Sequence, residues 1–109
     1  MANTFKLKTK ANVGVATVGI YTAPAATTTV VIGITLSNVS GSGVNVGVGI
    51  TRAGTTEDVK LLKNAPIPSG SSLEFMSGNK IVLEETDTVV VDSDTNNSVD
   101  ASLTIMEIT

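Results

Sequence analysis

The chain has 109 residues and a formal net charge of −3, a size that predicts one domain with a single hydrophobic core. It contains no cysteine, histidine or tryptophan, which excludes disulfides, thiol and imidazole catalysis and zinc sites of the Cys/His kind. We therefore expect neither an enzyme nor a cofactor. An apolar fraction of 41% with 3% aromatic residues predicts a folded chain built from small β-branched residues, which favour strands.

Apolar and polar residues alternate with a period of two, which predicts strands from the N-terminus onward. Residues 4–10 form the first strand, in which Phe5 and Leu7 alternate with lysines. Residues 13–21 form the second, with a bulge expected near Thr17, where the alternation slips. The next two strands, residues 30–36 and 44–50, are predicted to pair as a β-hairpin through a Ser/Gly turn.

In this hairpin, one face of each strand is expected to point into the core. The residues of these two faces are Val30, Ile32, Ile34, Leu36, Val44, Val46, Val48 and Ile50. Shorter strands are predicted at residues 59–62, 73–76, 81–83, 89–91 and 101–108. Eight or nine short strands with turn signals every 8 to 12 residues are typical of an antiparallel β-sandwich or jelly roll. The sequence therefore predicts a single all-β sandwich domain over residues 1–109.

The outward face of the predicted hairpin carries small residues. It would place Gly33 opposite Gly47 or Gly49, and a bare backbone on two paired strands is typical of a surface that another subunit approaches closely. An ordinary solvated face is the alternative. The first interpretation predicts a docking surface that includes the basic first strand; its residues are Gly33, Thr35, Gly47, Gly49, Thr51, Lys6, Lys8 and Lys10.

Charge is segregated along the chain. Residues 1–52 carry three lysines and Arg52 but no acid, whereas residues 53–109 carry all ten acids. The basic strand at residues 4–10 can be neutralised within the molecule, or it can dock on a neighbour. Neither half is basic enough for nucleic-acid binding, and aromatic platforms are missing. We also expect no membrane partner and no secretory signal, because no apolar run is long enough.

Asp92, Asp94 and Asn96 alternate like the first ligands of a calcium loop. However, Asn97 stands where glycine is usual, and Leu103 stands where the bidentate acid is needed. An Asx-rich hairpin turn is therefore favoured over a metal site.

Glu84, Glu85 and Asp87 lie close together after a predicted strand. A glycosidase needs two carboxylates across a cleft. Acids clustered in one turn are usually solvated, and the chain lacks the aromatic residues that line sugar subsites. We expect no catalytic role for them.

Several segments together form a strand-and-turn pattern that covers most of the chain. They are Ala2–Lys6, Tyr21–Pro24, Thr28–Gly33, Leu36–Asn38, Ile67–Leu73, Lys80–Leu83 and Val99–Ile105. This pattern resembles a family of small β-sandwich virion proteins of tailed bacteriophages, particularly the marine cyanophages. One departure is the segment Glu85-Thr86-Asp87, because such proteins commonly have glycine immediately before the aspartate that corresponds to Asp87.

The resemblance implies a non-enzymatic structural role in the virion, foremost as a capsid decoration protein, or else in the neck, tail or fibre base. Its partners would be other virion proteins of the capsid or tail, with assembly in the host cytoplasm. A symmetric homo-oligomer would supply a mate for the docking surface. The rival interpretation is a module that binds a host receptor or carbohydrate through loops 22–27, 53–58 and 93–98.

Overall fold

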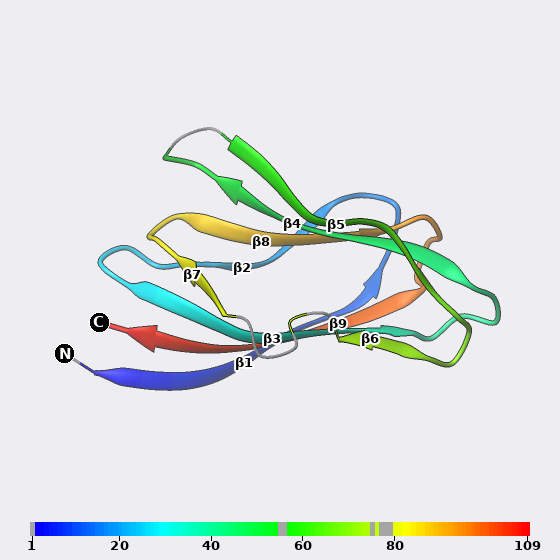
Figure 1. The fold of residues 1–109 in the computed structure, drawn as a ribbon, viewed down its shortest axis with the longest axis horizontal. Helices are drawn as coiled ribbons and strands as arrows, with labels where there is room; N and C mark the ends of the chain where they lie inside the picture. Colours follow the sequence, from blue (N-terminus) through cyan, green and yellow to red (C-terminus); the bar gives the residue numbers. More distant parts are fainter. Residues whose placement is uncertain (1, 55–56, 75, 77–79) are drawn as a thin grey trace.

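The computed structural model describes residues 2–54, 57–74, 76 and 80–109. In these ranges nine strands form two antiparallel sheets that pack as a sandwich (Figure 1). The five-stranded sheet contains β1 (Asn3–Val13), β9 (Val99–Ile108), β3 (Thr28–Asn38), β6 (Ser72–Glu74) and β7 (Ile81–Leu83). The four-stranded sheet contains β2 (Val18–Thr22), β8 (Asp87–Ser93), β4 (Val44–Arg52) and β5 (Glu57–Ile67). No helix in the described ranges is long and apolar enough to cross a membrane.

The strand order is that of a jelly roll. The order is β1-β9-β3-β6 in one sheet and β2-β8-β4-β5 in the other, and β7 also pairs with β3. Because β6 pairs with one end of β3 and β7 with the other, the two act as a single interrupted edge strand. The chain then crosses between the sheets after every strand except β4, as in a jelly roll of eight strands. The predicted all-β sandwich is confirmed.

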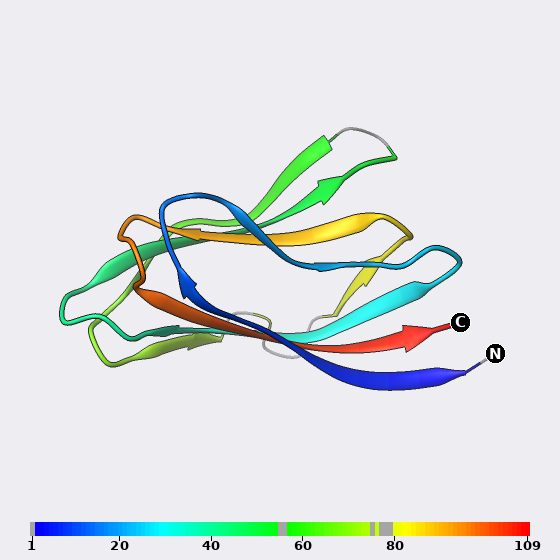
Figure 2. The ribbon, with the colours of Figure 1, turned by 180° about the vertical axis from the view of Figure 1, so that it is seen from behind.

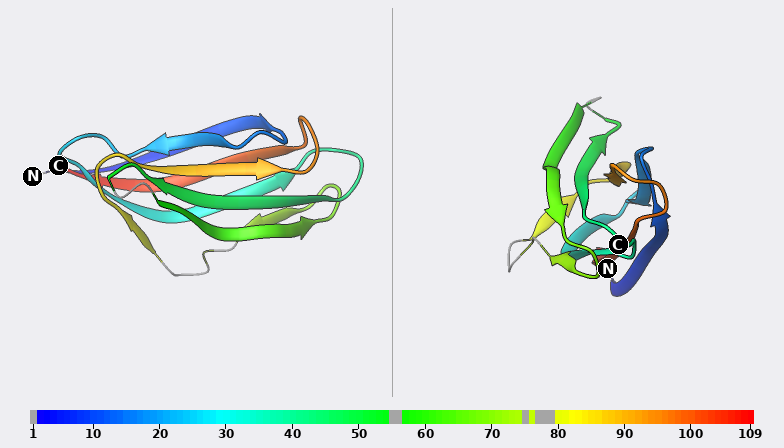
Figure 3. Two further views of the ribbon diagram at one scale, coloured as in Figure 1. Left: turned by 90° about the horizontal axis from the view of Figure 1, so that it is seen from above. Right: turned by 90° about the vertical axis from the view of Figure 1, so that its right-hand side faces the viewer.

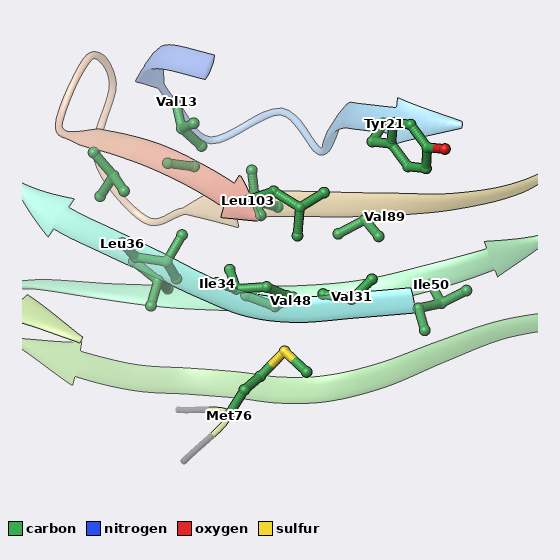
Figure 4. Packing of buried hydrophobic residues seen from close by; sticks show 14 of the residues in the cluster. Val13, Tyr21, Val31, Ile34, Leu36, Val48, Ile50, Met76, Val89 and Leu103 are labelled. Carbon is green, nitrogen blue, oxygen red and sulfur yellow. The ribbon is translucent and has the colours of Figure 1, made fainter. Parts of the chain in front are cut away.

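The core lies between the two sheets (Figure 3). Every second residue of the central strands points into it (Figure 4). On β9 the buried apolar residues include Leu103 and Ile105, and on β4 they include Val46 and Val48. Burying a side chain of this size stabilises the fold by about 1.5–3 kcal/mol. The predicted inward face of residues 44–50 is confirmed.

The predicted β-hairpin is wrong, because β3 and β4 belong to different sheets. The strand β3 pairs with β9, and β4 pairs with β5 and β8. Their apolar faces therefore meet across the core instead of lying side by side in one sheet. Buried Asn38 holds the connection between them, since its Nδ2 donates to the carbonyls of Ser42 (2.8 Å) and Ile67 (2.9 Å).

A bulge changes which residues of β3 are buried. The register with β9 shifts between Val31 and Gly33, so the alternation changes phase at this point. As a result Val31 is buried, whereas Val30 and Ile32, which were predicted to face the core, do not belong to its fully buried set. Beyond the bulge, Ile34 and Leu36 are buried as predicted.

The predicted second strand also differs from the structure. Val13 ends β1, and β2 begins only at Val18. Between them the chain crosses from one sheet to the other, and Val15 is exposed. The bulge lies between Gly19 and Tyr21 rather than near Thr17.

Candidate functional site

The outward face of the five-stranded sheet carries a row of apolar side chains. In the register of the sheet, Phe5 lies beside Met106, Met106 beside Val30, and Val30 beside Val82. We call these four residues the apolar row. It crosses β1, β9, β3 and β7 near the end of the sandwich where both chain termini lie (Figure 2). Phe5 is 67% exposed and Val82 is 61% exposed.

Next to the apolar row, the outer face carries Leu7 beside Thr104 on the edge strand and otherwise small, uncharged residues. Beside the apolar row, Thr104 lies next to Gly33, and in the following row Ser102 lies next to Thr35. Among the described strand residues whose side chains point outward on this sheet, the acids are Asp100 and Glu74. Both lie farther along the strands from the apolar row than Gly33 does. The solvated side of a sandwich normally alternates core residues with polar and charged ones. An uncharged half-face with an apolar row is therefore unusual for the solvated side of a sandwich.

Two of the predicted docking residues, Gly33 and Thr35, lie on this outer face. A Cβ atom added at Gly33 would meet nothing within 4 Å. The backbone there is bare and open, as the sequence predicted for this residue.

Gly47 and Gly49 do not belong to the same surface, and the prediction that placed them beside Gly33 is wrong. Both are buried and lie in the other sheet. A Cβ atom at Gly49 would lie 2.6 Å from the carbonyl oxygen of Val59, and one at Gly47 would lie 2.6 Å from Oδ1 of Asp92. The register shifts between β4 and β5 bring the β5 backbone close to these glycines.

Thr51 is half-buried on the four-stranded sheet, beside Thr88 and Asp58. It is therefore separated from Gly33 and Thr35 by the thickness of the sandwich. The small residues of β4 serve the close approach of β5 and not a common docking surface with β3.

The lysines of β1 point to the side opposite Phe5 and Leu7, because side chains alternate along a strand. Lys6 Nζ lies 2.8 Å from Oε1 of Glu107, and Lys8 and Lys10 follow it on the same side. Arg52 is the last basic residue of the segment 1–52, and its Nε lies 3.2 Å from Oδ1 of Asp87. The segregated charges therefore meet within one molecule at Lys6 and Arg52, which is the intramolecular alternative of the sequence analysis.

A buried polar network fastens β1 to the core. The Tyr21 hydroxyl lies 2.6 Å from Oε2 of Glu107 and 2.7 Å from Oγ1 of Thr29, and all three residues are buried. Burial, followed by the hydrogen bond to Glu107, raises the pKa of Tyr21 to about 12. The hydrogen bond from Lys6, followed by that from Tyr21, lowers the pKa of Glu107. The network stabilises the strand that carries Phe5 and Leu7.

This network predicts a loss of stability at high pH. Because folding raises the Tyr21 pKa from 10.0 to about 12, its contribution is complete below pH 10 and is lost as the pH rises toward 12. Tyr21→Phe should lower the free energy of unfolding by about 2 kcal/mol at neutral pH and make the alkaline decline shallower. Urea unfolding at a series of pH values measures both effects. An unchanged alkaline slope in the variant would contradict the assignment.

The lowered pKa of Glu107 acts at the other end of the pH scale. The contribution of Glu107 to stability is present above the ordinary carboxyl pKa and is lost as the pH falls through the lowered pKa of the folded state.

The titration of Tyr21 can be followed directly. It is the single tyrosine of the chain, so the absorbance of its phenolate reports its ionisation.

The acidic residues after β7 make structural contacts. Glu84 accepts a hydrogen bond from Arg52, and Oε2 of Glu85 accepts one from the backbone amide of Ala26 (2.8 Å). Asp87 is buried and accepts bonds from Arg52 and from the amide of Glu84. A shallow hollow of about 290 Å³ adjoins these carboxylates, but each of them already holds a donor of the fold.

Asp92 and Asp94, which the sequence analysis considered as calcium ligands, make hydrogen bonds at the ends of a turn. Oδ2 of Asp92 lies 3.2 Å from the hydroxyl of Thr17, and Oδ1 of Asp94 accepts from the amide of Asn45 (3.1 Å). Asn97 has a φ of 52°, in the left-handed region that asparagine tolerates. Among the described residues, no group of three Asp or Glu side chains is placed to hold a metal. The turn connects β8 and β9 across the two sheets, so it is not the hairpin turn that was predicted.

The loops proposed for receptor or carbohydrate binding do not form one edge. The loop at 22–27 lies beside the turn that contains Thr86, since the amide of Thr86 donates to the carbonyl of Ala23. Loop 53–58, of which residues 55 and 56 lie outside the described ranges, adjoins that end. Loop 93–98 lies at the opposite end of the sandwich (Figure 1), so the prediction of a common contact edge is wrong.

The sequence reasoning missed the apolar row. Phe5 and Leu7 stood out by their alternation with lysines, but their outward direction depends on the pairing of β1 with β9. Val30 was assigned to the core, and the bulge that turns it outward leaves no clear mark in the sequence.

No protein-family model and no curated protein matches the chain. Among solved structures, it is similar to a protein of Bacillus endospore appendages, which are described as a novel family of disulfide-linked pili. The similarity has a TM-score of 0.60 at 14% sequence identity and covers 99% of this chain and 87% of the other. At this identity the likeness shows a shared fold.

Proposed function

We propose that the protein is a non-enzymatic structural component of a bacteriophage virion, foremost a capsid decoration protein, which docks through the outer face of its five-stranded sheet. The observation that carries the proposal is this face, with its apolar row, its bare Gly33 and its uncharged surroundings. A surface of this kind loses unfavourable contact with water when a partner covers it.

The opposite side of the sandwich supports the choice of face. Across the outer side of the four-stranded sheet, Lys60 lies beside Gly49, Asp58 beside Thr51, and Asp92 beside Gly47. Charged residues of this kind are typical of a sheet face that is exposed to water. The contrast between the two sides favours contact through the five-stranded sheet.

Family resemblance and fold support the structural role. The sequence resembles small virion proteins of tailed phages, and jelly rolls are common in viral capsids. The similar Bacillus protein comes from pili described as disulfide-linked. The present chain has no cysteine, so the assembly we propose relies on noncovalent contacts.

The experiment compares Gly33→Leu with the wild type in virions of the phage that encodes the chain. As a monomer, Gly33→Leu should keep the wild-type unfolding midpoint, because the added side chain enters open space. Its recovery with purified virions should nevertheless fall at least about tenfold, as expected when a side chain obstructs a close-packed contact. Quantitative mass spectrometry of the particles measures the recovery.

Gly41→Leu is the matched control, since Gly41 lies in the connection between β3 and β4 and also has nothing within 4 Å of its added Cβ. This variant should be recovered like the wild type. Absence of the wild-type protein from virions, or normal recovery of Gly33→Leu, would overturn the proposal.

A further inference from the structure

We infer that the outer face of the five-stranded sheet binds a second copy of this chain, with a two-fold axis that runs parallel to the strands between β9 and β3. The inference deepens the proposed function, because it names the partner of the same surface. It rests on the arrangement of residues across the face, which is complementary to itself under this one rotation.

The apolar row matches its own copy. Its order across the sheet is Phe5, Met106, Val30, Val82. A two-fold axis along the centre of the row reverses this order in the facing copy. Phe5 then faces Val82 of the second copy, and Met106 faces its Val30, so each long side chain meets a short β-branched one.

The central positions of the next rows, on β9 and β3, match in the same way. Thr104 and Gly33 are neighbours in one row, and Ser102 and Thr35 in the next, so the rotation places each small residue against another small residue. The two sheets can therefore approach as closely as stacked sheets in a protein core, about 10 Å apart. A larger residue at Gly33 would hold them apart.

Charge also permits the self-association, although the chain as a whole is acidic. The row that contains Thr35 runs from Thr9 to Glu74, and the rotation places Glu74 against Thr9. Asp100 lies beside Ser37 and meets this serine in the other copy. The rotation thus places neither acid against an acid.

The area of the face is sufficient for a stable dimer. The central strand β3 has 11 residues, which corresponds to a length of about 36 Å, and four strand positions span about 19 Å. The product is about 700 Å² per copy, close to the roughly 800 Å² that each partner buries in a standard protein interface.

Cysteine cross-linking tests the geometry without background, because the chain has no cysteine of its own. In an equimolar mixture of Phe5→Cys and Val82→Cys proteins, a short bismaleimide cross-linker that spans about 10 Å should join the two chains, because facing residues of stacked sheets lie about this far apart. Each variant alone should not cross-link, since the two copies of the same residue would lie about a further 14 Å apart across the strands. Cross-links in the single-variant samples but not in the mixture would overturn the two-fold arrangement.

Sedimentation equilibrium of the cysteine-free chain provides the second measurement. The wild type should be a dimer. Phe5→Asp should raise the dissociation constant of the dimer by about a hundredfold, since the two-fold symmetry means that one substitution removes two apolar contacts. Val15→Asp is the control, because Val15 is exposed elsewhere, and it should dimerise normally. A monomeric wild type would refute the inference.

The two proposals fail separately. If recovery with virions depends on Gly33 but the free protein is monomeric and does not cross-link, the proposed function stands and a second copy is not the partner. If the protein dimerises as described but is absent from virions, this inference stands and the proposed function is wrong.

Discussion

Replacing Gly49 by leucine lowers the free energy of unfolding by about 3 kcal/mol, the upper range for overpacking a well-packed site. The Cβ atom of any larger residue would lie 2.6 Å from the carbonyl oxygen of Val59. This oxygen belongs to the backbone of β5, so relief requires a shift of the strand and not merely of a side chain. Urea unfolding followed by circular dichroism measures the effect.

Gly33→Leu is the matched control for this stability measurement. It makes the same substitution in the other sheet, where nothing lies within 4 Å of the added Cβ. At protein concentrations at which both proteins are monomeric, its unfolding free energy should stay within about 0.5 kcal/mol of the wild type. Equal stability of the two variants would mean that β5 does not approach Gly49 as closely as the structure shows.

Leu103→Ala lowers the free energy of unfolding by about 3–4 kcal/mol, within the range measured for truncated core leucines. Leu103 is fully buried on β9, at 0% exposure, and its removal leaves a cavity between the two sheets. Thermal or urea unfolding of the purified variant gives the value.

Leu7→Ala makes the same change on the adjacent strand, but at a side chain that is 65% exposed on the outer face. Its effect on the stability of the monomer should stay within about 0.5 kcal/mol. A loss comparable to that of Leu103→Ala would show that Leu7 belongs to a core, and would remove the reason to assign the outer face to a partner.

These two comparisons separate folding from docking. The glycines of β4 and the leucine of β9 are required by the sandwich itself, whereas Gly33, Leu7 and the apolar row are not needed for its packing. Residues that a monomer does not use, gathered on one uncharged face, are the physical basis of the proposed contact.

The sequence predicts the fold class because alternation records burial. Val44, Val46 and Val48 alternate with polar or small residues, and their burial follows from this pattern alone. Strand pairing is different, since the apolar faces of β3 and β4 are satisfied equally well by pairing in one sheet or by facing across the core. The partners that decide between these outcomes, β8 and β9, are about 50 or more residues away from β3 in the chain.

The candidate site is predicted only in part for the same reason. Gly33 and Thr35 lie on the outer face because they alternate with buried Ile34 and Leu36. Gly47 and Gly49 carry the same local signal, but the register shifts of β5 cover them. Val30 joins the apolar row through a bulge between Val31 and Gly33, which depends on pairing with β9 and is invisible to local alternation.

The most direct test of the central claim is the accessibility of the outer face in the assembled particle. Phe5→Cys and Val15→Cys are both exposed positions in the monomer, at 67% and 58% for the native residues, and at concentrations at which the free protein is monomeric a maleimide should label both rapidly. In purified virions that contain the protein, Phe5→Cys should be protected while Val15→Cys stays reactive. Equal labelling of the two positions in the virion would contradict docking through the five-stranded sheet.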